Sequence, residues 1–262
     1  MTLSKTELAE AAQKLLAAAR DLKPIDPLTE TYPGITVDEA YRIQLSTVEV
    51  RLSDGRKVVG KKIGLTSPAI QQMFAVTEPD YGHLLDDMLV YQGVGLVSSQ
   101  LLQPRIEGEI AFILERDLVG PGITPTDVIR ATAGVTAALE IIDSRIRDWK
   151  IKIQDTVADN ASSAAFVLGA RLTPLSGIDL RYVGYVMMKN GQLATAGAGA
   201  AVLGSPAQSV AWLANKMGQY GISLKAGEII LSGSAAAAVP VQAGDSIRLT
   251  VDRVGDVECY FC

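Results

Sequence analysis

Residues 104–114, with the sequence PRIEGEIAFIL, decide how the rest of this chain is organised. Aliphatic, aromatic and β-branched residues dominate the stretch and no helical period fits it, so it is predicted to form a strand. Side chains alternate along a strand, which places Glu107 and Glu109 on the same face. Two neighbouring carboxylates in an apolar strand repel each other and are costly to bury as ions, so a divalent cation is the expected compensation. Gly108 between them fits a close backbone approach or a bulge.

A third acid, Glu140, lies in a second predicted strand at residues 135–143, among alanine, leucine and isoleucine. Three carboxylates that converge from two strands would form an all-oxygen site, which suits Mg²⁺ or Mn²⁺. The alternative is that the acids are solvated strand residues or ion-pair partners of Arg105 and Arg145. The spacing of the glutamates does not decide between these two interpretations.

The composition is that of a globular protein with a sizeable core: 262 residues, 48% hydrophobic and 20% charged. A net charge of −5 without a block of Lys or Arg argues against nucleic acid or an anionic membrane as a partner. No apolar run approaches a membrane span and the first residues lack the apolar centre of a signal peptide, so a cytoplasmic protein is expected. The single histidine, His83, excludes a histidine-rich metal site and leaves acid–base chemistry to Lys, Asp, Glu or Tyr.

Local signals predict an α+β fold with an N-terminal helical region at residues 1–56 and a β core at residues 57–262. Capping boxes at Ser4 and Thr36 open two helices in the first region. The remaining elements are predicted as strand 57–65, a helix capped by Ser67, a loop at 78–82, helix 124–133, an active-site loop at 150–160, a hairpin at 182–195, helix 205–217, and strands 228–231, 246–252 and 257–261.

Two residues in these elements are candidates for chemistry. Lys62, in the strand that follows Gly60, is expected to point inward. Asp80 is either a turn former or an active-site acid.

Several sequence blocks occur together and in order over nearly the whole chain. They are residues 60–67 (GKKIGLTS), 78–82 (EPDYG), 104–112 (PRIEGEIAF), 142–145 (IDSR), 155–162 (DTVADNAS) and 197–204 (GAGAAVLG). In these blocks the chain resembles the 2-hydroxypenta-2,4-dienoate (2-oxopent-4-enoate) hydratases and the related 2-oxohex-3-enedioate (4-oxalocrotonate) decarboxylases of aromatic meta-cleavage degradation. The resemblance implies the fumarylacetoacetate hydrolase-like fold, a mixed β-barrel or β-roll with helices around it.

The resemblance also implies which residues bind the metal and carry the chemistry. Glu107, Glu109 and Glu140 match the ligands of Mg²⁺ or Mn²⁺ in that family, and Lys62 matches its lysine. Lys62 is expected to serve in acid–base chemistry or to polarise the substrate carboxylate, with a pKa lowered by burial and by the nearby metal. Asp80 is expected to orient or deprotonate water.

Residues near the 155–162 block are expected to contact the substrate. Ser162 is expected to hold the substrate carboxylate, while Asn160 and Leu65 also line the substrate site and Asp159 shapes the loop. The alternative for Ser162 and Asn160 is ordinary hydrogen bonding within the loop.

The resemblance favours a lyase that hydrates 2-hydroxypenta-2,4-dienoate to 4-hydroxy-2-oxopentanoate. The hydratases carry Asp at the position of Asp80, where the decarboxylases tend to carry an apolar residue. Residues 235–240 (AAAAVP) are closer to the decarboxylase pattern, so decarboxylation of 2-oxohex-3-enedioate is the alternative. A third hypothesis is a non-catalytic subunit in a complex with the sister enzyme, and the family implies a homo-oligomer. Hydrolysis is disfavoured because His83 matches poorly the histidine-bearing dyad of hydrolases with this fold.

Overall fold

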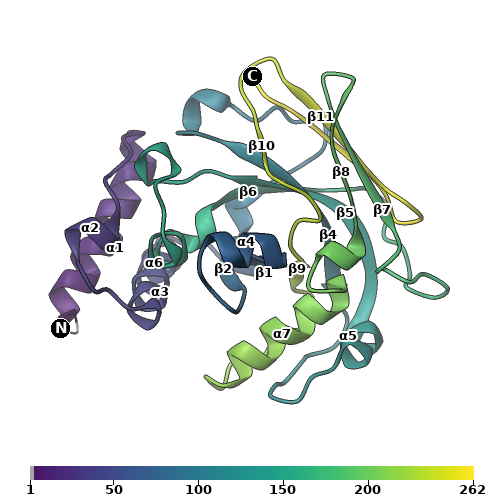
Figure 1. Cartoon of the computed structure of the whole chain (residues 1–262), viewed down its shortest axis with the longest axis horizontal. Helices are drawn as coiled ribbons and strands as arrows, with labels where there is room; N and C mark the ends of the chain where they lie inside the picture. Colours follow the sequence, from purple (N-terminus) through teal and green to yellow (C-terminus); the bar gives the residue numbers. More distant parts are fainter. Residues whose placement is uncertain (1–2) are drawn as a thin grey trace.

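The computed structural model describes residues 3–262, which fold into two β-sheets with helices packed around them (Figure 1). The α-helices are α1 (Lys5–Asp21), α2 (Leu28–Thr31), α3 (Val37–Ser53), α4 (Pro68–Met73), α5 (Pro125–Ala131), α6 (Ile153–Ala158) and α7 (Pro206–Gly218). The short 3-10 helices are η1 (Asp86–Met88), η2 (Ser98–Gln100), η3 (Arg147–Trp149), η4 (Asn160–Ser162) and η5 (Gly199–Ala201). The strands are β1 (Val58–Gly64), β2 (Asp80–Leu85), β3 (Leu89–Val90), β4 (Arg105–Leu114), β5 (Thr132–Ile142), β6 (Ser163–Leu168), β7 (Gly184–Lys189), β8 (Gln192–Ala198), β9 (Ile229–Leu231), β10 (Val239–Pro240), β11 (Ser246–Val251) and β12 (Gly255–Tyr260).

The larger sheet has the strand order β2-β1-β9-β4-β5-β6-β3, and β10 pairs with β4. It is a mixed sheet, because β1 pairs with β9 and β3 with β6 in parallel while the other pairs are antiparallel. The smaller sheet is antiparallel, in the order β12-β11-β7-β8. These mixed sheets and their flanking helices confirm the α+β prediction.

The N-terminal helices α1 and α3 lie side by side at one edge of the molecule, with α6 next to them (Figure 1). Both predicted capping boxes are present, at Ser4 and at Thr36, and each satisfies backbone N–H groups at the start of its helix. Apolar side chains of α1 and α3, such as Leu15 and Ile43, join the same hydrophobic core as the strands. The helical layer is therefore packed onto the sheet rather than folded as a separate unit.

Two of the predicted segments differ from the structure. Residues 78–82 do not form a loop throughout, because β2 begins at Asp80 and pairs with β1, with Asp80 opposite Gly64. Pairing with a neighbouring strand here outweighs the turn preference of Asp and Gly. The predicted loop at 150–160 contains the short helix α6.

Among the described residues, every helix is too short or too polar to cross a membrane.

Candidate functional site

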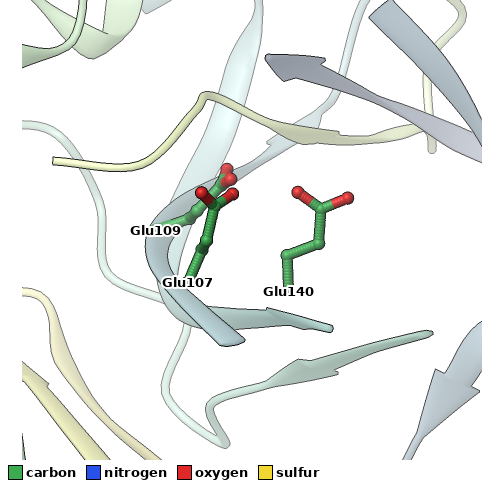
Figure 2. A group of neighbouring side chains, drawn as sticks. All are labelled: Glu107, Glu109 and Glu140. Atoms are coloured by element: carbon green, nitrogen blue, oxygen red, sulfur yellow. The ribbon is translucent and has the colours of Figure 1, made fainter. Parts of the chain in front are cut away.

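The three glutamates are brought together by the register of β4 and β5. Glu107 lies directly opposite Glu140 across the antiparallel pair, and Glu109 follows Glu107 on the same face of β4. Figure 2 shows the carboxylates of Glu107 and Glu109 close together, with that of Glu140 opposite them. One carboxylate oxygen from each residue lies within 4.8 Å of the others. The convergence expected from the sequence is thus present in the structure.

The surroundings of this glutamate cluster are unfavourable for unpaired negative charge. Glu109 and Glu140 are fully buried and Glu107 is partly buried. Within residues 3–262, Glu109 Oε1 and both carboxylate oxygens of Glu140 have no hydrogen-bond partner. Burial and the charge of Glu140 raise the pKa of Glu107 to about 7, and the same two causes raise the pKa of Glu109. Buried oxygens without partners are rare in folded proteins, and this donor set fits a hard divalent cation such as Mg²⁺ or Mn²⁺.

Lys62 is buried beside this cluster, as the inward orientation predicted for it requires. Its Nζ lies 3.4 Å from Glu140 Oε2 and donates a hydrogen bond of 3.1 Å to the backbone oxygen of Ala161. Burial lowers the pKa of Lys62, but Glu140, Asp80 and the other two glutamates raise it by more, so the net shift is upward. Without a bound cation the shift is therefore opposite to the expected one, because the carboxylates around the ammonium outnumber it.

Asp80 lies on the same face as Lys62, because it pairs with Gly64 on β1 and Lys62 pairs with Gly82 on β2. Asp80 is buried, its Oδ1 has no hydrogen-bond partner among the described residues, and burial raises its pKa. Gly64 makes room for it: a Cβ at Gly64 would lie 2.2 Å from Asp80 Oδ1 and 3.3 Å from Lys62 Nζ. The carboxyl and the ammonium therefore flank one point in space, which only a glycine leaves open.

The backbone oxygen that Lys62 contacts belongs to an unusual turn, η4. Three successive residues that are not glycine have positive φ angles there, at 54° for Asn160, 50° for Ala161 and 57° for Ser162. L-residues in this left-handed region each carry a penalty of about 1 kcal/mol, so the turn persists only if its surroundings hold it. The buried hydroxyl of Ser162 lies 3.3 Å from that of Thr156.

The other candidate site residues are placed as follows. Both amide atoms of Asn160 hydrogen-bond to the backbone of His83, and Asp159 pairs with Arg145 at 2.5 Å. Burial raises the pKa of Asp159 to about 6, although Arg145 acts against it. Leu65 follows Gly64 directly and has a φ of 55°.

Sequence reasoning missed several residues that support the site. The backbone N–H of Gly233 donates a hydrogen bond of 2.7 Å to Glu109 Oε2, and Gly82 lies flush against η4. Gln44 of α3 is fully buried and hydrogen-bonds to the backbone oxygens of Tyr81 and Val157. A lone Gln inside a helix carries no sequence signal for such a role, whereas glycines that flank candidate acids are a detectable signal.

Comparisons with known proteins agree with these features. The profile of the family described as fumarylacetoacetate (FAA) hydrolase C-terminal matches residues 75–261. The chain is 49% identical over 251 residues to a 2-hydroxyhexa-2,4-dienoate hydratase of Comamonas testosteroni, covering 95% of each protein. It is 50% identical over 222 residues to a 2-hydroxypent-2,4-dienoate hydratase of Pseudomonas putida, covering 84% of this chain and 100% of that one. The structure of 4-oxalocrotonate decarboxylase from Pseudomonas putida G7, complexed with magnesium and adipate, superposes with a TM-score of 0.96 at 39% identity and 99% coverage of both chains.

Proposed function

The chain belongs to the fumarylacetoacetate hydrolase C-terminal family, and we propose that it is a metal-dependent hydratase, a lyase of aromatic meta-cleavage degradation. Its substrate is 2-hydroxypenta-2,4-dienoate (2-oxopent-4-enoate) and its product is 4-hydroxy-2-oxopentanoate. Residues 57–262 form the catalytic core in this proposal and residues 1–56 a helical region that covers it. Relatives named as dienoate hydratases, at 49% and 50% identity, support the choice of reaction.

One observation carries the proposal: the carboxylates of Glu107, Glu109 and Glu140, the last two fully buried, converge beside Lys62 and Asp80. Buried carboxylate oxygens that lack hydrogen-bond partners within the protein are expected at a cation site, because the cation itself is their partner. The three glutamates would hold Mg²⁺ or Mn²⁺, which when bound offsets their charge and acts as a Lewis acid toward the oxygens of a 2-oxo acid. The magnesium-complexed structural relative supports a divalent ion of this kind.

Lys62 and Asp80 are assigned the proton transfers. The dienol first loses its 2-hydroxyl proton and gains one at C5, which gives the 2-oxo-3-ene; water then adds across the double bond, with its hydroxyl at C4 and a proton at C3. The Lys62 ammonium, which contacts Ala161 and Glu140, is assigned to attract the substrate carboxylate and to donate a proton. Asp80, whose pKa is raised by burial, is suited to exchange a proton with the water that adds at C4.

The remaining site residues are assigned to substrate binding and to its framework. The hydroxyl of Ser162 donates a hydrogen bond to the substrate carboxylate, which replaces its contact with Thr156. Leu65, beside Gly64, forms the apolar wall. Asn160 is also assigned to the substrate site, although its side-chain amide already hydrogen-bonds to the backbone of His83.

A second candidate is decarboxylation of 2-oxohex-3-enedioate, to which the TM-score of 0.96 with 4-oxalocrotonate decarboxylase gives weak support, because that relative is only 39% identical. Loss of CO₂ needs the same electron sink but no activated water. Asp80 would then have no water to activate, and its negative charge would oppose a second substrate carboxylate nearby.

A paired assay tests the proposal. Protein with Mg²⁺ or Mn²⁺ is given each substrate, and the ultraviolet absorbance of 2-hydroxypenta-2,4-dienoate and the release of CO₂ from 2-oxohex-3-enedioate are followed. We expect rapid loss of the dienoate absorbance with 4-hydroxy-2-oxopentanoate as product, and a large loss of that activity in Asp80→Asn. CO₂ release without dienoate turnover would instead establish the decarboxylase.

The proposal extends to assembly and location. A homo-oligomer in the cytoplasm is expected, as the resemblance to the hydratases implies. A complex with the sister decarboxylase is a further expectation. Size-exclusion chromatography, alone and with the sister enzyme, measures both.

A further inference from the structure

Strand β2 carries Asp80 and lies at the end of the larger sheet, paired only with β1 among the described strands. In this pair Asp80 lies opposite Gly64 and Gly82 lies opposite Lys62. Hydrogen-bonding direction alternates along a strand, and the backbone oxygen of Tyr81 and both backbone groups of His83 bond to side chains on the side away from β1. A strand edge buried without partners for these groups would be destabilised, so they must be satisfied by something other than a strand.

Two side-chain amides, of the fully buried Gln44 and the partly buried Asn160, take the place of the missing strand. Asn160 Oδ1 accepts a hydrogen bond of 2.8 Å from the His83 N–H, and Asn160 Nδ2 donates one of 2.9 Å to the His83 oxygen. Gln44 Nε2 donates to the Tyr81 oxygen at 3.0 Å, and Gln44 Oε1 lies 3.0 Å from His83 Nδ1. Since the Gln44 amide nitrogen is the donor in its other contacts, its oxygen accepts from the imidazole N–H.

The Asn160 contact joins β2 to the turn that orients Lys62. Gly82 lies directly across from Lys62 and close to η4: a Cβ on Gly82 would be 2.5 Å from the backbone oxygen of Asn160. The next residue, Ala161, supplies the oxygen that accepts the hydrogen bond from Lys62 Nζ. The strand that carries Asp80 and the turn that holds Lys62 are therefore fixed to each other through one carboxamide.

We propose that Asn160 is a positioning residue, which sets the relative placement of Lys62 and Asp80 by clamping η4 to the outer edge of β2. Gln44 holds the same edge from α3, so the N-terminal helical layer braces the reacting groups. The inference rests on the proposed function for its kinetic consequence, but its structural part does not depend on which reaction the site performs.

The chain offers a matched control for this clamp. Asn215 of α7 makes the same pair of contacts to the backbone of one residue, accepting from the Ile123 N–H at 2.8 Å and donating to the Ile123 oxygen at 2.8 Å. Asn160→Asp and Asn215→Asp each replace the donating NH₂ by an oxygen that faces a backbone oxygen, at nearly constant side-chain size. Asn160→Gly removes the whole clamp while leaving the left-handed backbone accessible.

The experiment compares kcat, KM and Tm of the two Asp variants with those of the wild type, and measures hydrogen exchange of the β2 peptide by mass spectrometry. We expect N160D to lower kcat at least tenfold and N215D less than twofold, at a similar loss of Tm. The amides of Asp80–Leu85 should exchange at least tenfold faster in N160G and be unchanged in N215D. Equal kcat in the two Asp variants, or unchanged β2 exchange in N160G, would overturn the proposal. A wild type that leaves the dienoate intact would refute the hydratase function, while the exchange result would still decide the clamp.

Discussion

Substitution of Gly64 by alanine is the sharpest steric test of the arrangement of Lys62 and Asp80. The new Cβ would lie 2.2 Å from Asp80 Oδ1, whereas such contacts are essentially never shorter than 3.0 Å. The carboxylate must therefore retreat by about 0.8 Å or more, and misplacement by about 1 Å lowers rates about 100-fold. The φ angle of Gly64 is not in the left-handed region, so alanine adds no backbone strain. Overpacking of this kind costs about 1–3 kcal/mol of stability, which leaves the protein folded.

The assay is the steady-state hydration rate at saturating metal, with Tm and circular dichroism as measures of folding. Gly184 in β7 is the control, because a Cβ there would have no neighbour within 4 Å and its φ is also ordinary. We expect kcat to fall about 100-fold in Gly64→Ala and to be unchanged in Gly184→Ala. If folded Gly64→Ala retains kcat within about threefold, the proximity of Asp80 to the reacting atoms is refuted.

Three other predictions concern stability. Because the pKa of Glu107 is raised to about 7, the metal-free protein loses stability as pH rises from about 4.5 to 7. Glu107→Gln should recover up to about 3 kcal/mol at pH 8 in EDTA and should lose the stabilisation that Mg²⁺ gives the wild type, both measured by denaturant titration. Burial and the charge of Lys61 lower the pKa of His83 to about 4, so the free energy of unfolding should fall by up to about 3 kcal/mol as pH drops from 6.5 to 4. His83→Asn, which keeps an N–H donor toward Gln44, should flatten this pH dependence; an unchanged slope would show that His83 does not cause it. Asp155 accepts hydrogen bonds from the backbone and hydroxyl of Thr29 and from the Lys152 N–H, so Asp155→Ala should cost about 3 kcal/mol, a result that an unaltered denaturation midpoint would exclude.

Much of the fold was readable from local signals in the sequence. The capping boxes at Ser4 and Thr36, the Asn190-Gly191 turn and the apolar runs of β4 and β5 all specify structure over a few neighbouring residues. Strand β2 was missed because Asp80 and Gly82 favour turns, and only pairing with β1, about 20 residues away in sequence, makes them a strand. Such pairing depends on the tertiary fold, which local preference does not encode.

The residues of the candidate site also differ in how far the sequence predicts their roles. Glu107 and Glu109 could be assigned to one face from alternation alone, and Glu140 from its apolar neighbours. The direction of the Lys62 pKa shift could not be predicted, because it depends on how many carboxylates surround the ammonium in three dimensions. Gln44 and Asn160 were equally beyond reach as clamps, since the backbone groups that they satisfy lie on a strand edge far along the chain.

The arrangement of charge explains why the same residues are unfavourable for stability and suitable for function. Glu107, Glu109, Glu140 and Asp80 surround one ammonium, so the fully ionised group carries an excess of negative charge in a buried setting. The apolar strands β4 and β5 hold the glutamates in place despite this repulsion, because a shift of register would turn their apolar side chains away from the core. A ligand that binds only the folded state stabilises it. A divalent cation bound at the glutamates would relieve their mutual repulsion, so the repulsion that destabilises the metal-free protein favours cation binding. A purely structural cluster of ion pairs would show the opposite pattern, with each buried carboxylate oxygen partnered by a donor of the chain.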